Sequence, residues 1–148
     1  MNAIHKINET DTNNVFFLDK KKNIIMDGFF TKILYSSPNY SILGLFFDFA
    51  IQGKISNNKF FGFDINSNVD KIAMYIEMEK QLLKNYKLVN QISKKSVHIL
   101  KSHLSQGYLK VFTKKEIRNK RYVLKVSGIW ETQTELGITY KLLECTYL

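Results

Sequence analysis

The stretch Ser41-Ile-Leu-Gly-Leu-Phe-Phe-Asp-Phe-Ala-Ile51 carries the strongest strand pattern in a chain of 148 residues. Large apolar side chains occupy every second position, and strict alternation of this kind predicts a half-buried β-strand. One face of the expected strand holds Leu43, Leu45, Phe47, Phe49 and Ile51. We expect the first four of these side chains to belong to the core. Aromatic residues, at 14% of the chain, favour a β-rich fold as a whole.

Further strand patterns lie on both sides of one helical pattern. Strands are expected over residues 15–18, 24–35, 59–63, 108–113, 121–130 and 136–143. Between the third and fourth of these, apolar residues recur at helical spacing and predict a helix over about residues 68–87, with Ser67 placed to cap its start. A second, short helix over residues 97–104 would close at Gly107, although a strand is an alternative there.

The order of the expected elements predicts a mainly β fold with one main helix (β+α). Strands, a central helix and further strands follow one another in the same order in a small closed barrel, so we expect an OB-fold-like antiparallel barrel of five to six strands. A helix packed on an antiparallel sheet is the alternative architecture. Residues 15–148 are expected to form this single OB-like domain, and residues 1–14, which have no apolar core, a flexible N-terminal arm.

The positive charge of the chain is concentrated in one segment. The net charge is +9, yet residues 80–125 alone hold 13 Lys and Arg against a single acid, Glu116. A segregated charge of this kind indicates a polyanionic partner. The alternative is an effect of composition, because Lys outnumbers Arg by 20 to 2 and Asn and Ile are abundant, as an A/T-rich coding sequence produces without selection for binding.

The strand pattern Tyr108-Leu-Lys-Val-Phe-Thr-Lys114 gives the clearest indication of a binding surface. Alternation places Leu109, Val111 and Thr113 on one face, and on the other Tyr108, Lys110, Phe112 and Lys114. Rings stack on nucleic-acid bases and ammonium groups pair with phosphates, so the second face suits a single strand. The opposite phase would bury both rings, but it would also bury two lysines, at a cost of several kcal/mol.

More basic residues follow in the next loop and strand. The expected nucleic-acid-binding residues are Tyr108, Lys110, Phe112, Lys114, Lys115, Arg118, Lys120, Arg121 and Lys125. Trp130 is a candidate stacking platform, but strict alternation places it with Leu124 and Val126, towards the core. A bulge at Gly128 would reverse its direction. We expect Trp130 in the core.

Motifs of the common enzyme classes are missing from the sequence. It holds no Walker loop, no G-x-G-x-x-G and no G-x-S-x-G, and its three His are scattered. Asp27, Asp48 and Asp64 would suit a metal ion if the fold brought them together, but carboxylates at turns and strand edges are the simpler interpretation. We therefore predict a binding protein that is not an enzyme and that uses no cofactor and no metal.

A single cysteine, Cys145, excludes an internal disulfide and a zinc site built from several cysteines. We expect it to be an inert strand residue in a protein of a reducing, intracellular compartment. No apolar run approaches the roughly 20 residues that a membrane helix needs, so no membrane partner is expected.

Two parts of the chain resemble the opening and closing strands of a viral protein family. The closing strands are matched by Tyr122-Val-Leu-Lys-Val-Ser-Gly-Ile-Trp-Glu131 and Gly137-Ile-Thr-Tyr-Lys141, and the opening strands by Met26-Asp-Gly-Phe-Phe-Thr-Lys-Ile-Leu-Tyr-Ser36. The family is the OB-fold single-stranded DNA-binding proteins of large nucleo-cytoplasmic DNA viruses, related to a phage replication protein. The resemblance does not extend to the long acidic tail of the phage relatives, because the last residues here are Leu143-Glu-Cys-Thr-Tyr-Leu148.

The resemblance implies a sequence-tolerant single-stranded DNA-binding protein that coats exposed strands in viral DNA replication, recombination or repair. It implies single-stranded nucleic acid as the partner, DNA favoured over RNA, and the host cytoplasm, a viral factory or the virion as the location. A homo-oligomer and contacts with viral replication proteins are compatible with this role. The alternative is a non-enzymatic virion or scaffold protein with a basic surface that contacts nucleic acid.

Overall fold

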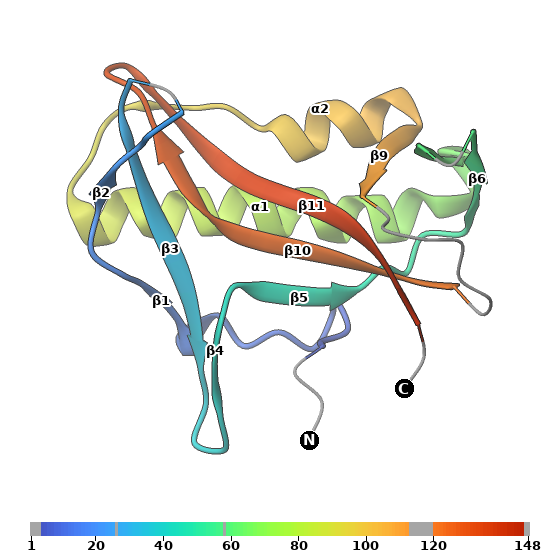
Figure 1. The fold of residues 1–148 in the computed structure, drawn as a ribbon, viewed down its shortest axis with the longest axis horizontal. Helices are drawn as coiled ribbons and strands as arrows, with labels where there is room; N and C mark the ends of the chain where they lie inside the picture. Colours follow the sequence, from blue (N-terminus) through green and yellow to red (C-terminus); the bar gives the residue numbers. More distant parts are fainter. Residues whose placement is uncertain (1–3, 26, 58, 113–119, 147–148) are drawn as a thin grey trace.

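The computed structural model describes residues 4–25, 27–57, 59–112 and 120–146, and Figure 1 shows their arrangement. The strands before the long helix are β1 (Val15–Phe17), β2 (Lys21–Lys22), β3 (Phe29–Ser36), β4 (Ser41–Leu43), β5 (Leu45–Asp48), β6 (Gly53–Ser56) and β7 (Phe60–Phe63). The helix α1 (Val69–Asn90) is followed by β8 (Lys95–Ser96), α2 (Ile99–Gln106), β9 (Tyr108–Phe112), β10 (Lys120–Glu131) and β11 (Glu135–Thr146). Short 3₁₀ turns, Thr12–Asn14 and Asn66–Asn68, precede β1 and α1. The protein is therefore mainly β with one main helix, as predicted.

The strands form an open sheet, so the predicted closed barrel of five to six strands is wrong. The described residues contribute eleven strands, and the main path through the sheet runs β1-β3-β10-β11-β9-β7-β6. A barrel needs its two edge strands to pair, whereas β1 and β6 end this path at opposite edges. The sheet is also mixed rather than antiparallel throughout, because β11 runs parallel to β8 and β9. The structure agrees with the alternative in having a helix packed on a sheet, but not in the antiparallel sheet that this alternative specified.

The helix α1 covers one face of the sheet and buries it without barrel closure (Figure 1). Side chains at most 1% exposed meet there from both layers: Tyr75, Leu83 and Tyr86 from the helix, and Phe47, Leu124 and Ile129 from the strands. The Tyr75 hydroxyl donates to the carbonyl of Asp48 and accepts the N–H of Ala50, which fixes the helix against the end of β5. The helix predicted over about residues 68–87 is confirmed.

The two helices begin and end at residues that the sequence only partly identifies. Asn68 rather than Ser67 precedes α1, and its buried amide group bonds the backbone of Gln52 and Asp64. The Ser67 hydroxyl instead donates to the Asp64 carboxylate at 2.5 Å, so the predicted Ser67 cap is wrong. Gly107 ends α2 with a φ of +87°, as its position after the second helical pattern predicts.

The predicted strand over residues 41–51 is divided at Gly44. This glycine has a φ of +92°, a conformation that glycine adopts without strain, and there the chain leaves β3 and continues alongside β10. The turn changes the alternation, because Leu45 and Phe47 are buried while Leu43 is 51% exposed. The core assignment is therefore confirmed for Leu45, Phe47 and Phe49 and wrong for Leu43.

A second irregularity, in β10, turns Trp130 away from the core. The pairing of β10 with β11 shifts register between Val126 and Gly128, as in a β-bulge. After the shift Ile129 and Glu131 are fully buried, and Trp130 lies half-buried on the other face. The expected core position of Trp130 is wrong, and the bulge at Gly128 is the reason.

The chain turns between Asn23 and Gly28, so the strand predicted over residues 24–35 begins only at β3. The N–H of Asn23 donates to the carbonyl of Gly28, and Ile24 and Ile25 are almost fully exposed. A Cβ atom on Gly28 would lie 1.9 Å from the carbonyl oxygen of Glu131, and its φ is +151°. Only glycine allows this close approach to the β10–β11 turn.

The start of the described chain lies against β5 at His5. The N–H of His5 donates to the carbonyl of Phe46, and the N–H of Asp48 donates to the carbonyl of His5, each at 2.8 Å. Ile7 packs against the core. The flexibility expected of residues 1–14 stays a prediction, and residues 1–3 lie outside the described ranges.

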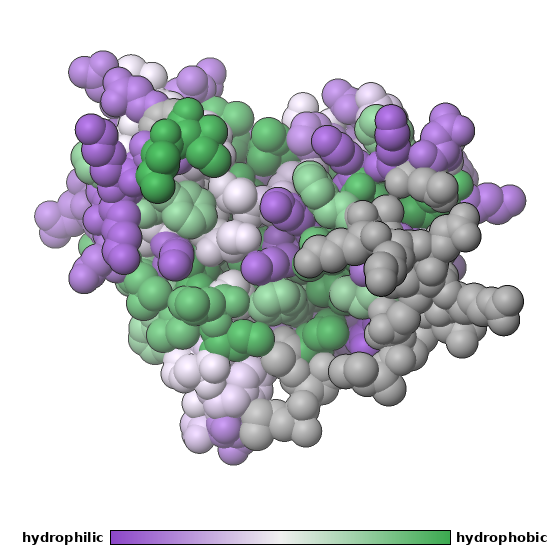
Figure 2. Space-filling model, in the orientation of Figure 1, coloured by the Kyte–Doolittle hydropathy of each residue, from purple (hydrophilic) through white to green (hydrophobic). Residues whose placement is uncertain are grey.

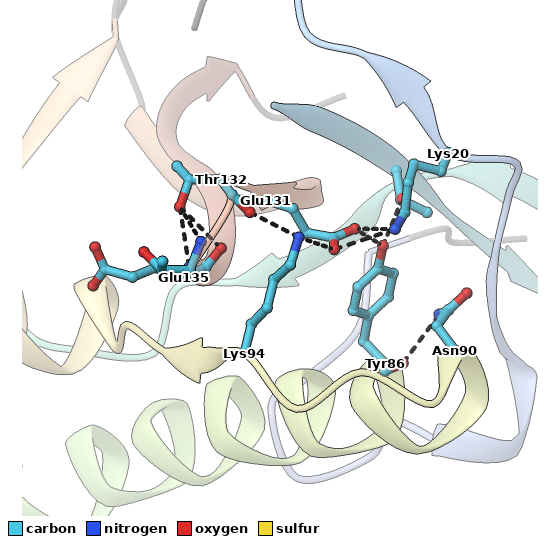
Figure 3. Close-up of polar contacts among 9 residues, drawn as sticks. Lys20, Tyr86, Asn90, Lys94, Glu131, Thr132 and Glu135 are labelled. Atoms are coloured by element: carbon cyan, nitrogen blue, oxygen red, sulfur yellow. Dashed lines mark hydrogen bonds and ion pairs between the residues drawn. The ribbon is translucent and has the colours of Figure 1, made fainter. Parts of the chain in front are cut away.

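A buried carboxylate connects the helix layer to the sheet. Glu131, at the end of β10, is fully buried and accepts a 2.5 Å hydrogen bond from the Tyr86 hydroxyl of α1. It also pairs with Lys20 at 3.0 Å and with Lys94 at 3.1 Å, from the segments before β2 and β8 (Figure 3). The Thr31 hydroxyl of β3 completes the cluster, 2.9 Å from that of Tyr86. Side chains from five parts of the chain therefore share one buried network.

Candidate nucleic-acid interface

The strand β9 presents the face that the sequence predicts. Leu109 and Val111 are buried, whereas Tyr108 is 46% exposed, Phe112 is 41% exposed and Lys110 is also exposed. The opposite phase, with both rings in the core, is excluded. The predicted residues Lys114, Lys115 and Arg118 lie outside the described residues, as does the side chain of Lys120.

Neighbouring strands add aromatic and basic side chains to the same face of the sheet. In β7, Phe60 pairs in register with Lys110, and its ring lies 5.6 Å from that of Tyr108 in an edge-on arrangement. In β11, the ammonium group of Lys141 lies 5.0 Å from the centre of the Phe112 ring, and that of Lys110 lies 5.3 Å from it. Two ammonium groups, from β9 and from β11, therefore lie close to the Phe112 ring.

Towards the centre of the sheet, Lys125 and Phe46 repeat this arrangement. The two residues pair in register between β10 and β5, and the Lys125 ammonium lies 5.5 Å from the centre of the Phe46 ring. Arg121 was expected beside Lys125, but its guanidinium forms an ion pair with Asp48 at 3.1 Å. Lys125 thus joins the residues of β9 on this face, while Arg121 is held by a neighbouring carboxylate.

Two further rings lie over glycines of the adjacent strand. A Cβ atom on Gly137 would be 2.6 Å from the Trp130 ring, and one on Gly128 would be 2.7 Å from the Phe30 ring. The rings therefore occupy the space that side chains would fill there. The indole N–H of Trp130 donates to the carbonyl of Ile138 at 3.2 Å, so its one polar group is satisfied within the protein. Trp130 is half-buried and lines a groove of the sheet, so part of its ring is accessible to a ligand.

We call this surface the outer aromatic face, because it lies on the side of the sheet away from α1. Its residues are the six aromatics Phe30, Phe46, Phe60, Tyr108, Phe112 and Trp130 and the three lysines Lys110, Lys125 and Lys141. Figure 2 shows this side of the molecule, where apolar side chains surround isolated hydrophilic ones over the central strands. Five of the nine, Phe30, Phe46, Phe60, Trp130 and Lys141, are absent from the sequence-based site.

A groove of about 540 Å³ opens between the outer aromatic face and α2. Among the described residues, two residue pairs join β9 to β11, and the groove lies beside the part of β9 that is not paired with β11. Phe112 and Trp130 line one side, and His103 and Gln106 of α2 line the other. His103 Nδ1 is hydrogen-bonded to the hydroxyl of Tyr140. Burial, and then the charge of Glu79, raises the pKa of Tyr140 well above its usual value, so this hydroxyl stays neutral.

The described residues contain no cluster of three or more His, Cys, Asp or Glu side chains that would hold a metal ion. Asp48 is paired with Arg121, and Asp64 accepts the Ser67 hydroxyl, so these two carboxylates have partners within the protein. Within the same ranges, no helix combines the length and apolar character that crossing a membrane requires. The chemistry of the outer aromatic face is therefore that of rings and ammonium groups.

No protein-family model, no curated protein and no solved structure matches this chain. The resemblance to viral single-stranded DNA-binding proteins depends on the quoted residues alone.

Proposed function

We propose that the protein binds single-stranded DNA across the outer aromatic face, by stacking of bases on its rings and pairing of phosphates with its lysines. The observation that carries the proposal is the interleaving of exposed or half-exposed rings with cations on one sheet face. Every base has a face that stacks, so the binding tolerates any sequence. The resemblance adds a role in viral DNA replication, recombination or repair.

The spacing of cations and rings supports this mode of binding. Three lysine ammonium groups lie 5.0–5.5 Å from the centres of the Phe46 and Phe112 rings. At exposed sites such cation–ring contacts contribute only about 0.5–1 kcal/mol, so a phosphate attracts the ammonium group away at small cost. A base that stacks on Phe112 then has Lys110 and Lys141 beside its flanking phosphates.

The same geometry disfavours duplex DNA on this face. Bases in a duplex already stack on one another and do not offer their faces to Trp130 or Phe112.

We propose no catalytic role and no cofactor. Three further proposals depend on the resemblance. The first is a preference for DNA over RNA, and the second is an intracellular location in the host cytoplasm, a viral factory or the virion. The third is contact with copies of the chain or with viral replication proteins.

A second candidate function has an observation of its own. At the β1 end of the same sheet face, Phe16, Leu34 and Leu43 pair in register across β1, β3 and β4, and Phe16 and Leu43 are 50% and 51% exposed. Adjacent exposed apolar side chains suit contact with another protein. They favour a non-enzymatic virion or scaffold protein whose basic surface contacts nucleic acid.

Two substitutions separate stacking from charge. Phe112→Ala is expected to weaken oligothymidine binding by roughly 1–3 kcal/mol with an unchanged salt dependence, because it removes one stacking ring. Lys110→Ala is expected to weaken binding and to flatten the slope of log K against log salt by about 0.7, the loss of one phosphate contact. Fluorescence anisotropy of a labelled oligothymidine at several salt concentrations measures both.

Phe16→Ala is the matched control, because Phe16 is a similarly exposed phenylalanine at the β1 end of the sheet and is not one of the nine residues of the outer aromatic face. It should leave oligothymidine affinity unchanged. Equal affinity for duplex and single strand, together with no effect of Phe112→Ala, would leave only a nonspecific basic surface, and the scaffold function would then be preferred.

A further inference from the structure

A second basic groove lies on the flank of α1, on the helix side of the sheet. Its volume is about 540 Å³, and its polar lining consists of Lys80, Lys84, Lys87, Ser93, Ser96 and His98. The three lysines are spaced by four and three residues, so they project from one side of the helix. The helix lies behind the sheet in the view of Figure 1, and the lining of the groove shares no residue with the outer aromatic face. We call it the α1 groove.

The lysines of the α1 groove have no acidic partner among the residues that the structure describes. Within the described ranges, Lys87 alone of the three has a polar contact, with the Ser96 hydroxyl at 3.3 Å. The neighbouring acid Glu79 is buried and accepts the backbone N–H groups of Leu100 and Lys101 at the start of α2. Like charges three and four residues apart destabilise a helix slightly. An anion in the groove would remove this repulsion.

We propose that the α1 groove binds the phosphodiester backbone of nucleic acid without contacting the bases. Three ammonium groups and the hydroxyls of Ser93 and Ser96 are donors suited to phosphate oxygens. Among the described residues, the lining holds no Phe, Tyr or Trp, and its one ring is the small imidazole of His98, so the groove offers no large stacking platform that would require an unstacked base. The groove accepts duplex and single-stranded backbone alike, and a molecule with a single strand on its outer aromatic face can hold an adjoining duplex.

Duplex DNA is the probe for this groove, because its bases cannot stack on the rings of the outer aromatic face and only phosphate contacts remain. The triple variant K80Q/K84Q/K87Q is expected to bind a short blunt duplex at least about tenfold more weakly at low salt. The slope of its log K against log salt should flatten by about 2.7, which corresponds to the loss of three duplex phosphate contacts. The double variant F112A/W130A should bind the duplex as the unaltered protein does, while its affinity for a short oligothymidine falls. A long oligothymidine added to F112A/W130A tests whether the groove also takes single-stranded backbone.

The control K6Q/K22Q/K54Q removes the same charge from three exposed lysines elsewhere on the surface. It should lower duplex affinity much less than the α1 groove variant does. Equal losses in the two triple variants, or no loss in K80Q/K84Q/K87Q, would overturn the inference. If the unaltered protein binds the duplex through these lysines but does not bind oligothymidine, the proposed function fails and the α1 groove stands.

Discussion

Replacement of Phe47 by alanine is expected to lower the free energy of unfolding by about 3–5 kcal/mol, as large-to-small changes in a packed core do. Phe47 is 0% exposed on β5, between the sheet and α1. Its ring lies edge-on to that of Tyr75, with ring centres 6.4 Å apart. Alanine loses the burial of the ring and leaves a cavity that the helix cannot close without moving its other contacts. Chemical denaturation followed by circular dichroism measures the loss.

Leu43→Ala is the matched control. Leu43 and Phe47 belong to the same alternating run of the sequence, but Leu43 is 51% exposed because the chain turns at Gly44. Its replacement should change the free energy of unfolding by no more than about 0.5 kcal/mol, the usual range for surface positions. If both variants lose several kcal/mol, residues 41–51 form one continuous strand with a common buried face, and the division at Gly44 is wrong.

Removal of the buried carboxylate by Glu131→Ala is expected to cost about 3 kcal/mol of unfolding free energy. The loss of one partner from a buried ion pair leaves the other charge uncompensated, and such losses are typically about 3–5 kcal/mol. The lower end applies because the side chains of Lys20 and Lys94 are 36% and 25% exposed and reach water in part. Thermal and chemical denaturation at neutral pH measure the effect.

The pH dependence identifies the charge as the cause. Burial alone would raise the pKa of Glu131, but the hydrogen bond from Tyr86 and the pairing with Lys20 and Lys94 outweigh it and hold the pKa below its usual value. A carboxyl group with a lowered pKa in the folded state stabilises the protein above its unfolded pKa, near 4.5, and loses this contribution as the pH falls through the folded value. The stability difference between the unaltered protein and Glu131→Gln should therefore be constant above about pH 5 and shrink below it. A difference that persists unchanged into acid would assign the effect to packing.

The helices, and the alternation of buried and exposed side chains within one β-strand, were predictable because each depends on residues a few positions apart. The spacing of Val69 to Leu83 and the glycine at 107 are local signals, and both helices lie where these signals place them. Barrel closure is a property of the edge strands β1 and β6, and alternation does not encode which strands pair. Gly44 and Gly128 each shift which side chains of their strand face the core. The sequence alone does not tell these glycines from the glycines that leave the alternation of buried and exposed side chains unchanged.

Part of the candidate site was predictable for the same reason. The face of β9 follows from alternation within five residues, and Lys110 settled its phase. The remaining rings come from separate strands, so only the pairing of β3, β5, β7 and β11 with their neighbours brings Phe30, Phe46, Phe60 and Lys141 to the same face. In the sequence, Glu131 begins the polar stretch that joins two expected strands. Its buried partner Tyr86 lies 45 residues earlier, so no local pattern connects the two residues.

The most direct test of single-strand binding uses Trp130, the only tryptophan of the chain. It is half-buried on the outer aromatic face, where its indole lies against Gly137 on one side. A base that stacks on the other side should quench its emission, so titration with oligothymidine is expected to quench Trp130 fluorescence to saturation, in parallel with anisotropy. A duplex bound at low salt should leave the emission unchanged. Oligothymidine binding seen by anisotropy without any change in Trp130 emission, or equal quenching by the duplex, would contradict stacking on this face.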